Sequence, residues 1–313
     1  MNDLLKLASN ALKPLGYHII RHGAPNILRI SNLEKECDSL KPLRTSQYGE
    51  NQTENTNLDS FIVYLRICMR KNRNIDTKAR LTKTDIQENT LRCVNSLIKS
   101  MNEAKNLGDI NLMILDDRSD EEALKALQTL LKTAQFPFML KQTDKTGQGE
   151  SLYEQFCLGK EQNAITYFVE DDFLHEKDGI SSVWAFYKQI YNDFKTHCMI
   201  HPQEHCSLHS KYYPSYIIAS PDRHWRTIRH ATHTLLTHGH IVRDYWRYFE
   251  NTKYVGVKKK RKRGSEAKTT NKIFNHIPGF APLQPFAVHL QQEGLLPPYY
   301  DWKPLWEANK IKD

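Results

Sequence analysis

The sequence is a basic chain of 313 residues with a formal net charge of +8, 39% hydrophobic residues and 26% charged residues. It does not resemble a membrane-spanning protein, because no apolar run approaches the roughly 18–20 residues that a spanning helix needs. Nor does it resemble a secreted one, because the first residues lack a signal pattern and the six cysteines are scattered. A cytoplasmic protein with anionic partners is the class that these features favour.

Residues 1–56 are predicted to form a segment apart from the rest of the chain. The stretch "LLKLASNALKPL" places its apolar residues on one helical face before Pro14 ends the pattern. Residues 45–58 are polar and turn-rich, which is typical of a linker or a surface loop. The helix would either cap the main domain or lie on a membrane surface as an amphipathic segment.

From residue 57 onward, buried strands alternate with amphipathic helices. The patterns predict strands at 61–69, 110–117, 136–142 and 164–172, with intervening helices within 83–104, 119–134 and 149–163. Thr84 or Asp85 is expected to cap the first helix, and Ser119 with Glu122 to form a capping box at the second. Near-continuous apolar strands alternating with helices predict one α/β domain over 57–313 with a mainly parallel sheet flanked by helices.

Two of these strands end in acidic residues. Asp116 and Asp117 end the second strand, and Glu170, Asp171 and Asp172 end the fourth. Ligands of such sheets bind beyond the carboxyl ends of the strands, and clustered carboxylates suit a hard divalent cation such as Mg²⁺ or Mn²⁺. The alternative is that the acids only cap the helices that follow.

The order of these elements, with "ILDDRSD" after the second strand and "VEDD" after the fourth, resembles the GT-A family of nucleotide-sugar glycosyltransferases. The resemblance implies a GT-A-like (Rossmann-like) mixed sheet and a base or ribose contact from Asp116 or Asp117. It also implies that Asp172 is the direct metal ligand, with Glu170 or Asp171 nearer the sugar and ribose. Glu170 stands where the strict motif has Asp, so the roles within the triplet stay open.

The basic stretch "RICMRKNR" after the first strand offers candidate partners for the diphosphate of a nucleotide sugar, namely Arg66, Arg70 and Arg73.

Two stretches of the C-terminal half, "SPDRHWRT" and "PGFAPLQPFAVHLQQEGLLPPYYDW", resemble a bacterial and phage subgroup of this fold. The likeness then covers roughly residues 60–302. It implies that His289 is a further metal ligand, and an imidazole is a suitable partner for Mn²⁺. The alternative is a histidine that is satisfied near the surface.

The catalytic base of an inverting enzyme would be a carboxylate that takes the proton of the acceptor hydroxyl. Asp222 in "SPDRHWRT" is the first candidate, because the neighbouring side chains suit an acceptor wall. Asp244, Glu250 and Glu293 are its competitors. A retaining enzyme would need no such base.

The stretch "HCMIHPQEHCSLHS" offers a second candidate metal site. It carries dense zinc-type ligands, namely His197, Cys198, His201, His205, Cys206 and His209. The spacing is poor, since there is no Cys-x-x-Cys pair and Pro202 interrupts the stretch. The alternative is an acceptor-side loop that is merely rich in histidine.

The basic run "KKKRKR" lies inside a loop predicted over residues 251–272. It has three interpretations: a nuclear-localisation or nucleic-acid patch, an anchor to an anionic membrane surface, or a solvated loop.

Together these features predict a metal-dependent glycosyltransferase with Mn²⁺ or Mg²⁺. It would move a sugar from a nucleoside-diphosphate sugar to a hydroxyl of a glycan or lipid-linked acceptor, in the cytoplasm or at the inner face of the membrane, where surface polysaccharide is built. One alternative is a sugar nucleotidyltransferase, against which "MRKNRNID" counts because it lacks glycine. The other is a non-enzymatic basic nucleic-acid-binding protein, which ranks last because nothing but charge points to nucleic acid.

Overall fold

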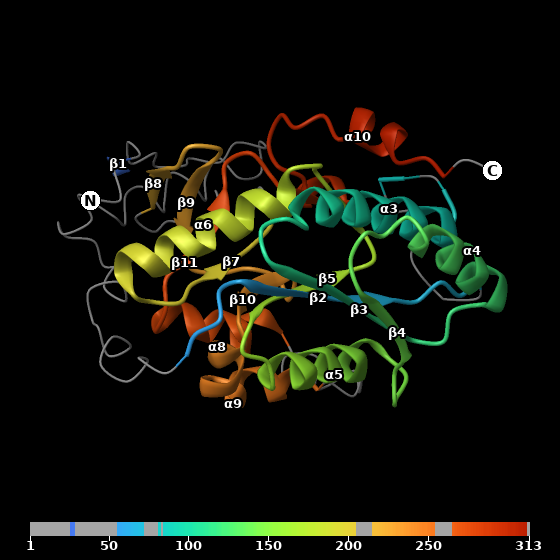
Figure 1. The fold of residues 1–313 in the computed structure, drawn as a ribbon, viewed down its shortest axis with the longest axis horizontal. Helices are drawn as coiled ribbons and strands as arrows, with labels where there is room; N and C mark the ends of the chain where they lie inside the picture. Colours follow the sequence, from blue (N-terminus) through green and yellow to red (C-terminus); the bar gives the residue numbers. More distant parts are fainter. Residues whose placement is uncertain are drawn as a thin grey trace, which may run out of the picture.

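The computed structural model describes residues 26–28, 55–71, 81–82, 84–204, 215–253 and 265–311. A twisted central sheet runs through the molecule with helices on both of its faces (Figure 1). Among the described residues this sheet has ten strands in the order β1-β8-β9-β11-β7-β10-β5-β2-β3-β4. The predicted α/β class, with a mixed, mainly parallel sheet flanked by helices, is confirmed.

The half of the sheet predicted from sequence is entirely parallel. Its strands are β2 (Ser60–Ile67), β3 (Asp109–Asp116), β4 (Phe138–Gln142) and β5 (Ile165–Glu170). Both faces of β2 and β5 are covered, and for that reason their sequences are almost continuously apolar. The crossovers contain α3 (Ile86–Ala104), α4 (Glu121–Leu131) and α5 (Gln148–Lys160). In Figure 1, α3 and α4 lie on one face and α5 on the other.

The other half of the sheet is mixed and continues from β5. Strand β10 (Leu235–His238) runs antiparallel to β5 and to β7 (Met199–Ile200), while β11 (Gly279–Pro282) is parallel to β7. The outer strands are β9 (His224–Ile228), β8 (Tyr216–Ala219) and β1 (Asn26–Leu28). The helices of this half are α6 (Gly179–Phe194), α8 (Gly239–Asp244) and α9 (Trp246–Phe249), followed by the 3-10 helices η5 (Glu250–Thr252), η7 (Glu266–Lys268) and η8 (Thr270–Asn275).

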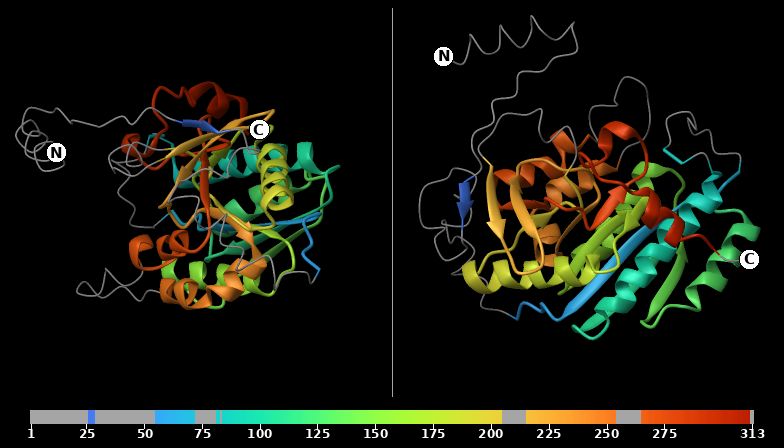
Figure 2. Two further views of the ribbon diagram at one scale, coloured as in Figure 1. Left: turned by 90° about the vertical axis from the view of Figure 1, so that its left-hand side faces the viewer. Right: turned by 90° about the horizontal axis from the view of Figure 1, so that it is seen from above.

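A separate two-stranded sheet brings the C-terminal part of the chain to the end of β5. Strand β6 (Phe173–His175) follows the acidic triplet directly, and it pairs with β12 (Ala287–His289) in antiparallel register, His289 opposite Phe173. After η9 (Glu293–Leu295), helix α10 (Lys303–Ala308) lies on the same side of the sheet as α3 (Figures 1 and 2). The guanidinium of Arg92 on α3 stacks over the Trp306 ring at 4.4 Å and fastens α10 there.

The two predicted helix caps have different outcomes. Asp85 caps α3, since its carboxylate accepts a hydrogen bond from the Glu88 N–H at 2.8 Å. The capping box at Ser119 is wrong, because α4 begins one residue later with Asp120 in the cap position. The Ser119 hydroxyl instead accepts a hydrogen bond from the Met69 N–H at 2.8 Å, which ties the turn after β3 to the end of β2.

Several predicted features lie wholly or largely outside the described residues. They are the amphipathic helix within 1–56, Arg73, and the basic run "KKKRKR" within 251–272. Within the described part of the chain, no helix combines the length and the apolar character needed to cross a membrane. The division into segment 1–56 and domain 57–313 stays a prediction.

Candidate active site

The two predicted acidic groups lie at the same edge of the sheet. Strand β2 lies between β3 and β5, and its last residues pair with the acidic ends of both. Asp116 is opposite Ile67, and Glu170 is opposite Arg66. The carboxyl ends of the three parallel strands β3, β2 and β5 therefore lie side by side, and both acidic groups lie at this edge. Ligands of such sheets usually bind at this edge.

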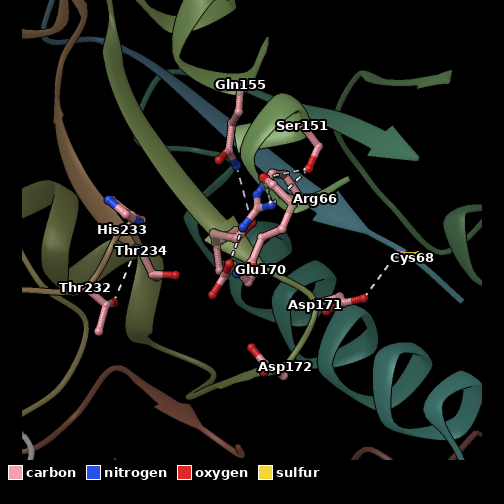
Figure 3. A network of polar contacts seen from close by, with 12 residues as sticks. Arg66, Cys68, Ser151, Gln155, Glu170, Asp171, Asp172, Thr232, His233 and Thr234 are labelled. Atoms are coloured by element: carbon pink, nitrogen blue, oxygen red, sulfur yellow. Dashed lines mark hydrogen bonds and ion pairs between the residues drawn. The ribbon is translucent and has the colours of Figure 1, made fainter. Parts of the chain in front are cut away.

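Glu170 forms an ion pair with Arg66, its neighbour across the sheet (Figure 3). The Arg66 guanidinium also donates hydrogen bonds to the Gln148 carbonyl at 3.2 Å and to the Ser151 hydroxyl at 3.0 Å, both in the first turn of α5. Arg66 is buried. The predicted diphosphate ligand Arg66 is thus placed as the counter-charge of the acidic triplet and as a tie between β2, β5 and α5.

Asp171 is held by the backbone beyond β2 and by α3. Its Oδ2 accepts hydrogen bonds from the Cys68 N–H at 3.0 Å and from the Thr90 hydroxyl at 3.3 Å. In Figure 3 the side chain points toward Cys68, away from Asp172. These contacts fix the backbone after β2 and orient the triplet.

Asp172 contacts His289, the histidine singled out from the sequence. His289 Nε2 lies 3.2 Å from Asp172 Oδ2, and both side chains are largely enclosed. The imidazole stacks on the Phe173 ring at a centroid distance of 4.5 Å, and its backbone N–H donates to Gln203 Oε1 at 2.9 Å. Pairing of β6 with β12 therefore presents a fixed imidazole to the end of β5.

The donor set fits a divalent cation. One ligand atom from each of Glu170, Asp172 and His289 lies within 4.8 Å of the other two. Two carboxylates suit Mg²⁺ and Mn²⁺ alike, and the imidazole favours Mn²⁺. The implied ligands Asp172 and His289 both belong to this group, and its third member is Glu170 rather than Asp171; their role as metal ligands stays a prediction.

Asp116 and Asp117 differ in how they are used. The Asp116 carboxylate accepts the Ser119 N–H at 3.0 Å and closes the turn after β3. Asp117 Oδ2 accepts the Gly147 N–H at 2.9 Å and lies 3.6 Å from the Arg70 guanidinium. Asp117 Oδ1 is buried and makes no hydrogen bond with any described residue. The Arg118 guanidinium lies 3.9 Å from this oxygen, so of the two residues Asp117 is the one with an acceptor atom that is not hydrogen-bonded to a described residue.

The loop before β10 contributes side chains that sequence reasoning missed. Figure 3 shows Thr232, His233 and Thr234 beside the Arg66–Glu170 pair. Burial lowers the pKa of His233 to about 4, with a smaller raising effect from Glu170. This imidazole is therefore neutral near pH 7. Only the pairing of β10 with β5 brings these residues to the site, and no local pattern marks them.

Two of the candidate bases, Asp222 and Asp244, lie away from this group. Asp222 is exposed in the turn between β8 and β9, and three strands, β11, β7 and β10, separate β9 from β5. Asp244 ends α8 at the opposite edge of the sheet. Glu293 lies in η9, four residues after His289, in a segment whose Leu295 carbonyl accepts a hydrogen bond from Gln203 at 2.8 Å.

Of the six candidate zinc ligands in the histidine-rich stretch, the structure describes only His197, Cys198 and His201, so a zinc site drawn from this stretch stays a prediction. His201 Nδ1 lies 2.7 Å from the Gln203 carbonyl and its Nε2 lies 3.1 Å from the Thr232 hydroxyl. His197 and Cys198 are buried directly before β7, and His205, Cys206 and His209 lie outside the described residues.

No protein-family model matches the sequence, and no curated protein matches it either. Solved structures similar to this chain include S. aureus TarS, with 11% identity over 71% of this chain and a TM-score of 0.40. UDP-glucose pyrophosphorylase in complex with UDP-glucose matches 79% of this chain at 12% identity, with a TM-score of 0.42. The mannosyltransferase PcManGT from Pyrobaculum calidifontis, in complex with GDP-Man and Mn²⁺, matches 55% at 10% identity, with a TM-score of 0.31.

The chain spans 36% of the length of TarS, 96% of that of the pyrophosphorylase and 44% of that of the mannosyltransferase. Likenesses at these values do not place the chain in a family.

Proposed function

We propose that the protein is a metal-dependent glycosyltransferase that uses a nucleoside-diphosphate sugar. The observation that carries this proposal is the group formed by Glu170, Asp172 and His289, which gathers three metal-type donors within 4.8 Å at the carboxyl end of β5. Asp117 follows β3, the strand next to β2, and keeps a buried carboxylate oxygen without a hydrogen bond to any described residue. Such an edge suits a nucleotide whose diphosphate is bridged to the protein by a cation.

Each acidic side chain then has a distinct role. Asp172 and His289 would hold Mn²⁺ or Mg²⁺, and Glu170 would complete the group while its charge is balanced by Arg66. When bound, the ion neutralises the charge that develops on the departing nucleoside diphosphate. Asp171 would act through position alone, because its hydrogen bonds hold the backbone beyond β2.

The nucleoside would bind at the end of β3. Asp117 offers an acceptor for a ribose hydroxyl or a base N–H. Arg70 is partly exposed and lies 3.6 Å from Asp117, so its guanidinium can contact a diphosphate from the same edge. Asp116, engaged with Ser119, would shape the turn that presents them.

The acceptor would be a hydroxyl of a glycan or a lipid-linked intermediate. The excess of positive charge suits an acceptor or a membrane surface that is anionic. Asp222 remains a predicted base for an inverting reaction, with Glu293 as the competitor that lies nearer to His289 along the chain.

The test is a calorimetric titration of the full chain with UDP, GDP, CMP and dTDP, with and without Mn²⁺. We expect one nucleotide to bind in a metal-dependent manner to the wild type and to Asp222→Asn, and at least tenfold more weakly to Asp172→Asn. Binding unchanged in Asp172→Asn and in His289→Gln would overturn the proposed site.

Turnover then separates the two enzyme classes. Release of the nucleoside diphosphate from the nucleotide sugar that binds, in the presence of an acceptor, is the expected result. Formation of a nucleotide sugar from a nucleoside triphosphate and a sugar 1-phosphate would instead identify a sugar nucleotidyltransferase.

A further inference from the structure

Three histidines meet at the edge of the sheet opposite the acidic group. His197 precedes β7, His238 is the last residue of β10, and His240 lies in the first turn of α8. His238 is opposite Ile165, the first residue of β5, so this group lies at the amino end of the strand whose other end carries Glu170. One ring nitrogen of each histidine lies within 4.8 Å of those of the other two.

The three rings pack against one another. The His197 and His238 rings are stacked at a centroid distance of 4.6 Å, and His240 meets His238 at 4.4 Å with its plane inclined by 65°. His197 and His238 are fully buried, whereas His240 is only partly buried. The group therefore has an inner part fixed by the core and an outer member that reaches toward solvent.

Two buried ring nitrogens in this group lack hydrogen bonds. His197 uses Nδ1 for a 2.8 Å contact with the Tyr187 hydroxyl, while its Nε2 makes no hydrogen bond with any described residue. His238 Nε2 likewise has no partner at full hydrogen-bonding geometry among the described residues, although the Asn57 backbone lies close enough to this ring to raise its pKa as a hydrogen bond does. A buried polar atom left without a hydrogen bond is unfavourable, because it has lost its contact with water. Two such atoms in one cluster of imidazoles point to a ligand that accepts their lone pairs.

We propose that His197, His238 and His240 bind a zinc ion. Imidazole nitrogens are standard zinc ligands, and three protein ligands with a water molecule in the fourth position are a known coordination. The second contact of a zinc-bound histidine usually fixes its tautomer, and the Tyr187 hydroxyl is placed to do this for His197. Burial lowers the pKa of His238 to about 3 and that of His197 well below its usual value, so both rings are neutral, as ligands must be.

Binding requires a small adjustment. A tetrahedral zinc ion with nitrogens at 2.0–2.1 Å brings those nitrogens to about 3.4 Å from one another, so the rings must move inward from their present separations. His238 Nδ1 now accepts the His240 N–H at 3.2 Å; ligation through Nε2 would move the ring proton to Nδ1 and release this weak bond. The partly exposed ring of His240 has the freedom to close the site.

A polar pocket of about 450 Å³ is lined by residues that include Asn57 and Thr56. Thr56 accepts a hydrogen bond from Tyr191 at 3.1 Å, and the Tyr191 ring packs 4.8 Å from that of His197. Thr56 and Tyr191 therefore connect this pocket to the surroundings of His197.

The experiment is a zinc titration of the metal-stripped full chain, with Co²⁺ as a spectroscopic probe of geometry. We expect the wild type to bind one Zn²⁺ and its Co²⁺ form to show the intense visible bands of a tetrahedral site. His240→Gln should bind at least tenfold more weakly and lose those bands. His224→Gln, which changes an exposed histidine on β9, is the matched control and should behave as wild type.

Two further variants separate this site from its rivals. Asp172→Asn disables the acidic group and should leave zinc binding intact, as should His205→Gln/His209→Gln. Zinc binding that is lost in either of these but kept in His240→Gln would overturn the proposal, as would a wild type that binds no Zn²⁺. Retained circular dichroism of His240→Gln shows that weaker binding is not unfolding.

Discussion

Arg66 and Glu170 are opposite one another in the register of β2 and β5, and their side chains form an ion pair. The three consecutive acids of the triplet therefore have three different partners. Glu170 faces an arginine, Asp171 accepts a backbone N–H and a threonine hydroxyl, and Asp172 faces an imidazole. Three adjacent like charges can coexist at a strand end because each is directed to a different source of positive charge or hydrogen bonds.

Replacing Arg66 should lower the free energy of unfolding more than it weakens nucleotide binding. Arg66→Met leaves a partly buried Glu170 carboxylate without its partner and removes two hydrogen bonds to α5. We expect a loss of up to about 3 kcal/mol in the free energy of unfolding, since breaking a buried pair by removing one partner is costly. Urea unfolding measures it. In Arg66→Met/Glu170→Gln part of the loss should return; a double variant as unstable as the sum of the singles would contradict the pairing.

Substitutions of Asp171 and of Asp172 should have different effects, the first mainly on stability and the second mainly on metal-dependent binding. Asp171→Asn weakens two hydrogen bonds to a carboxylate and should lower the free energy of unfolding by about 1–3 kcal/mol. Asp172→Asn should instead abolish the effect of Mn²⁺ on nucleotide affinity while changing stability by less. Calorimetry and urea unfolding on both proteins test this. Equal losses of metal-dependent binding in the two variants would contradict the assignment.

The sequence predicts the parallel half of the sheet well, because its signals are local. The apolar runs at β2, β3 and β5 and the helical spacing of α3 and α4 each lie within one segment. The carboxyl-edge position of the acids follows from that order alone. The partners of those acids cannot be predicted in the same way. Arg66 contacts Glu170 because the register of β2 and β5 places the two residues opposite one another, and the spacing of charges along the sequence does not reveal that register.

The mixed half of the sheet was harder to predict for a physical reason. Strands β7, β11 and β12 have only two to four residues, too few for an alternation to be recognised. Thr232 and His233 reach the site because β10 is inserted antiparallel beside β5, a long-range pairing with no local signal. His289 was found only through a resemblance, since no spacing links it to Asp172.

Acid should destabilise the protein through His175. Burial lowers its pKa to about 3, against 6.5 for an ordinary histidine. Below pH 6.5 the unfolded chain takes up a proton that the folded chain does not, so the free energy of unfolding falls by about 1.4 kcal/mol for each pH unit down to the folded pKa. Above pH 6.5 the contribution is fully present.

The measurement for His175 is urea unfolding between pH 7 and pH 4.5 for the wild type and His175→Gln. The variant should lose stability less steeply as the pH falls, because Gln does not titrate. Parallel curves would show that His175 is protonated in the folded state, contrary to its enclosure beside Tyr167.

Gly239 separates His238 from His240 and allows a close backbone approach. A Cβ atom there would collide with the Gln162 and Gly159 carbonyls. Gly239→Ala should therefore cost about 1–3 kcal/mol of stability and displace the start of α8. Gly294→Ala, where an added Cβ meets nothing within 4 Å, is the control. Thermal unfolding of the two variants decides; equal melting temperatures would contradict the close approach.

The pairing of β6 with β12 has a consequence for the order in which the protein acquires its chemistry. Asp172 and His289 are separated by 117 positions in the chain. At usual rates of protein synthesis, the histidine leaves the ribosome on the order of ten seconds after the aspartate. A nascent chain can fold its parallel strands during that interval and yet hold an incomplete set of donors. Competence to bind a cation at the end of β5 would therefore report that the C-terminal strand has docked.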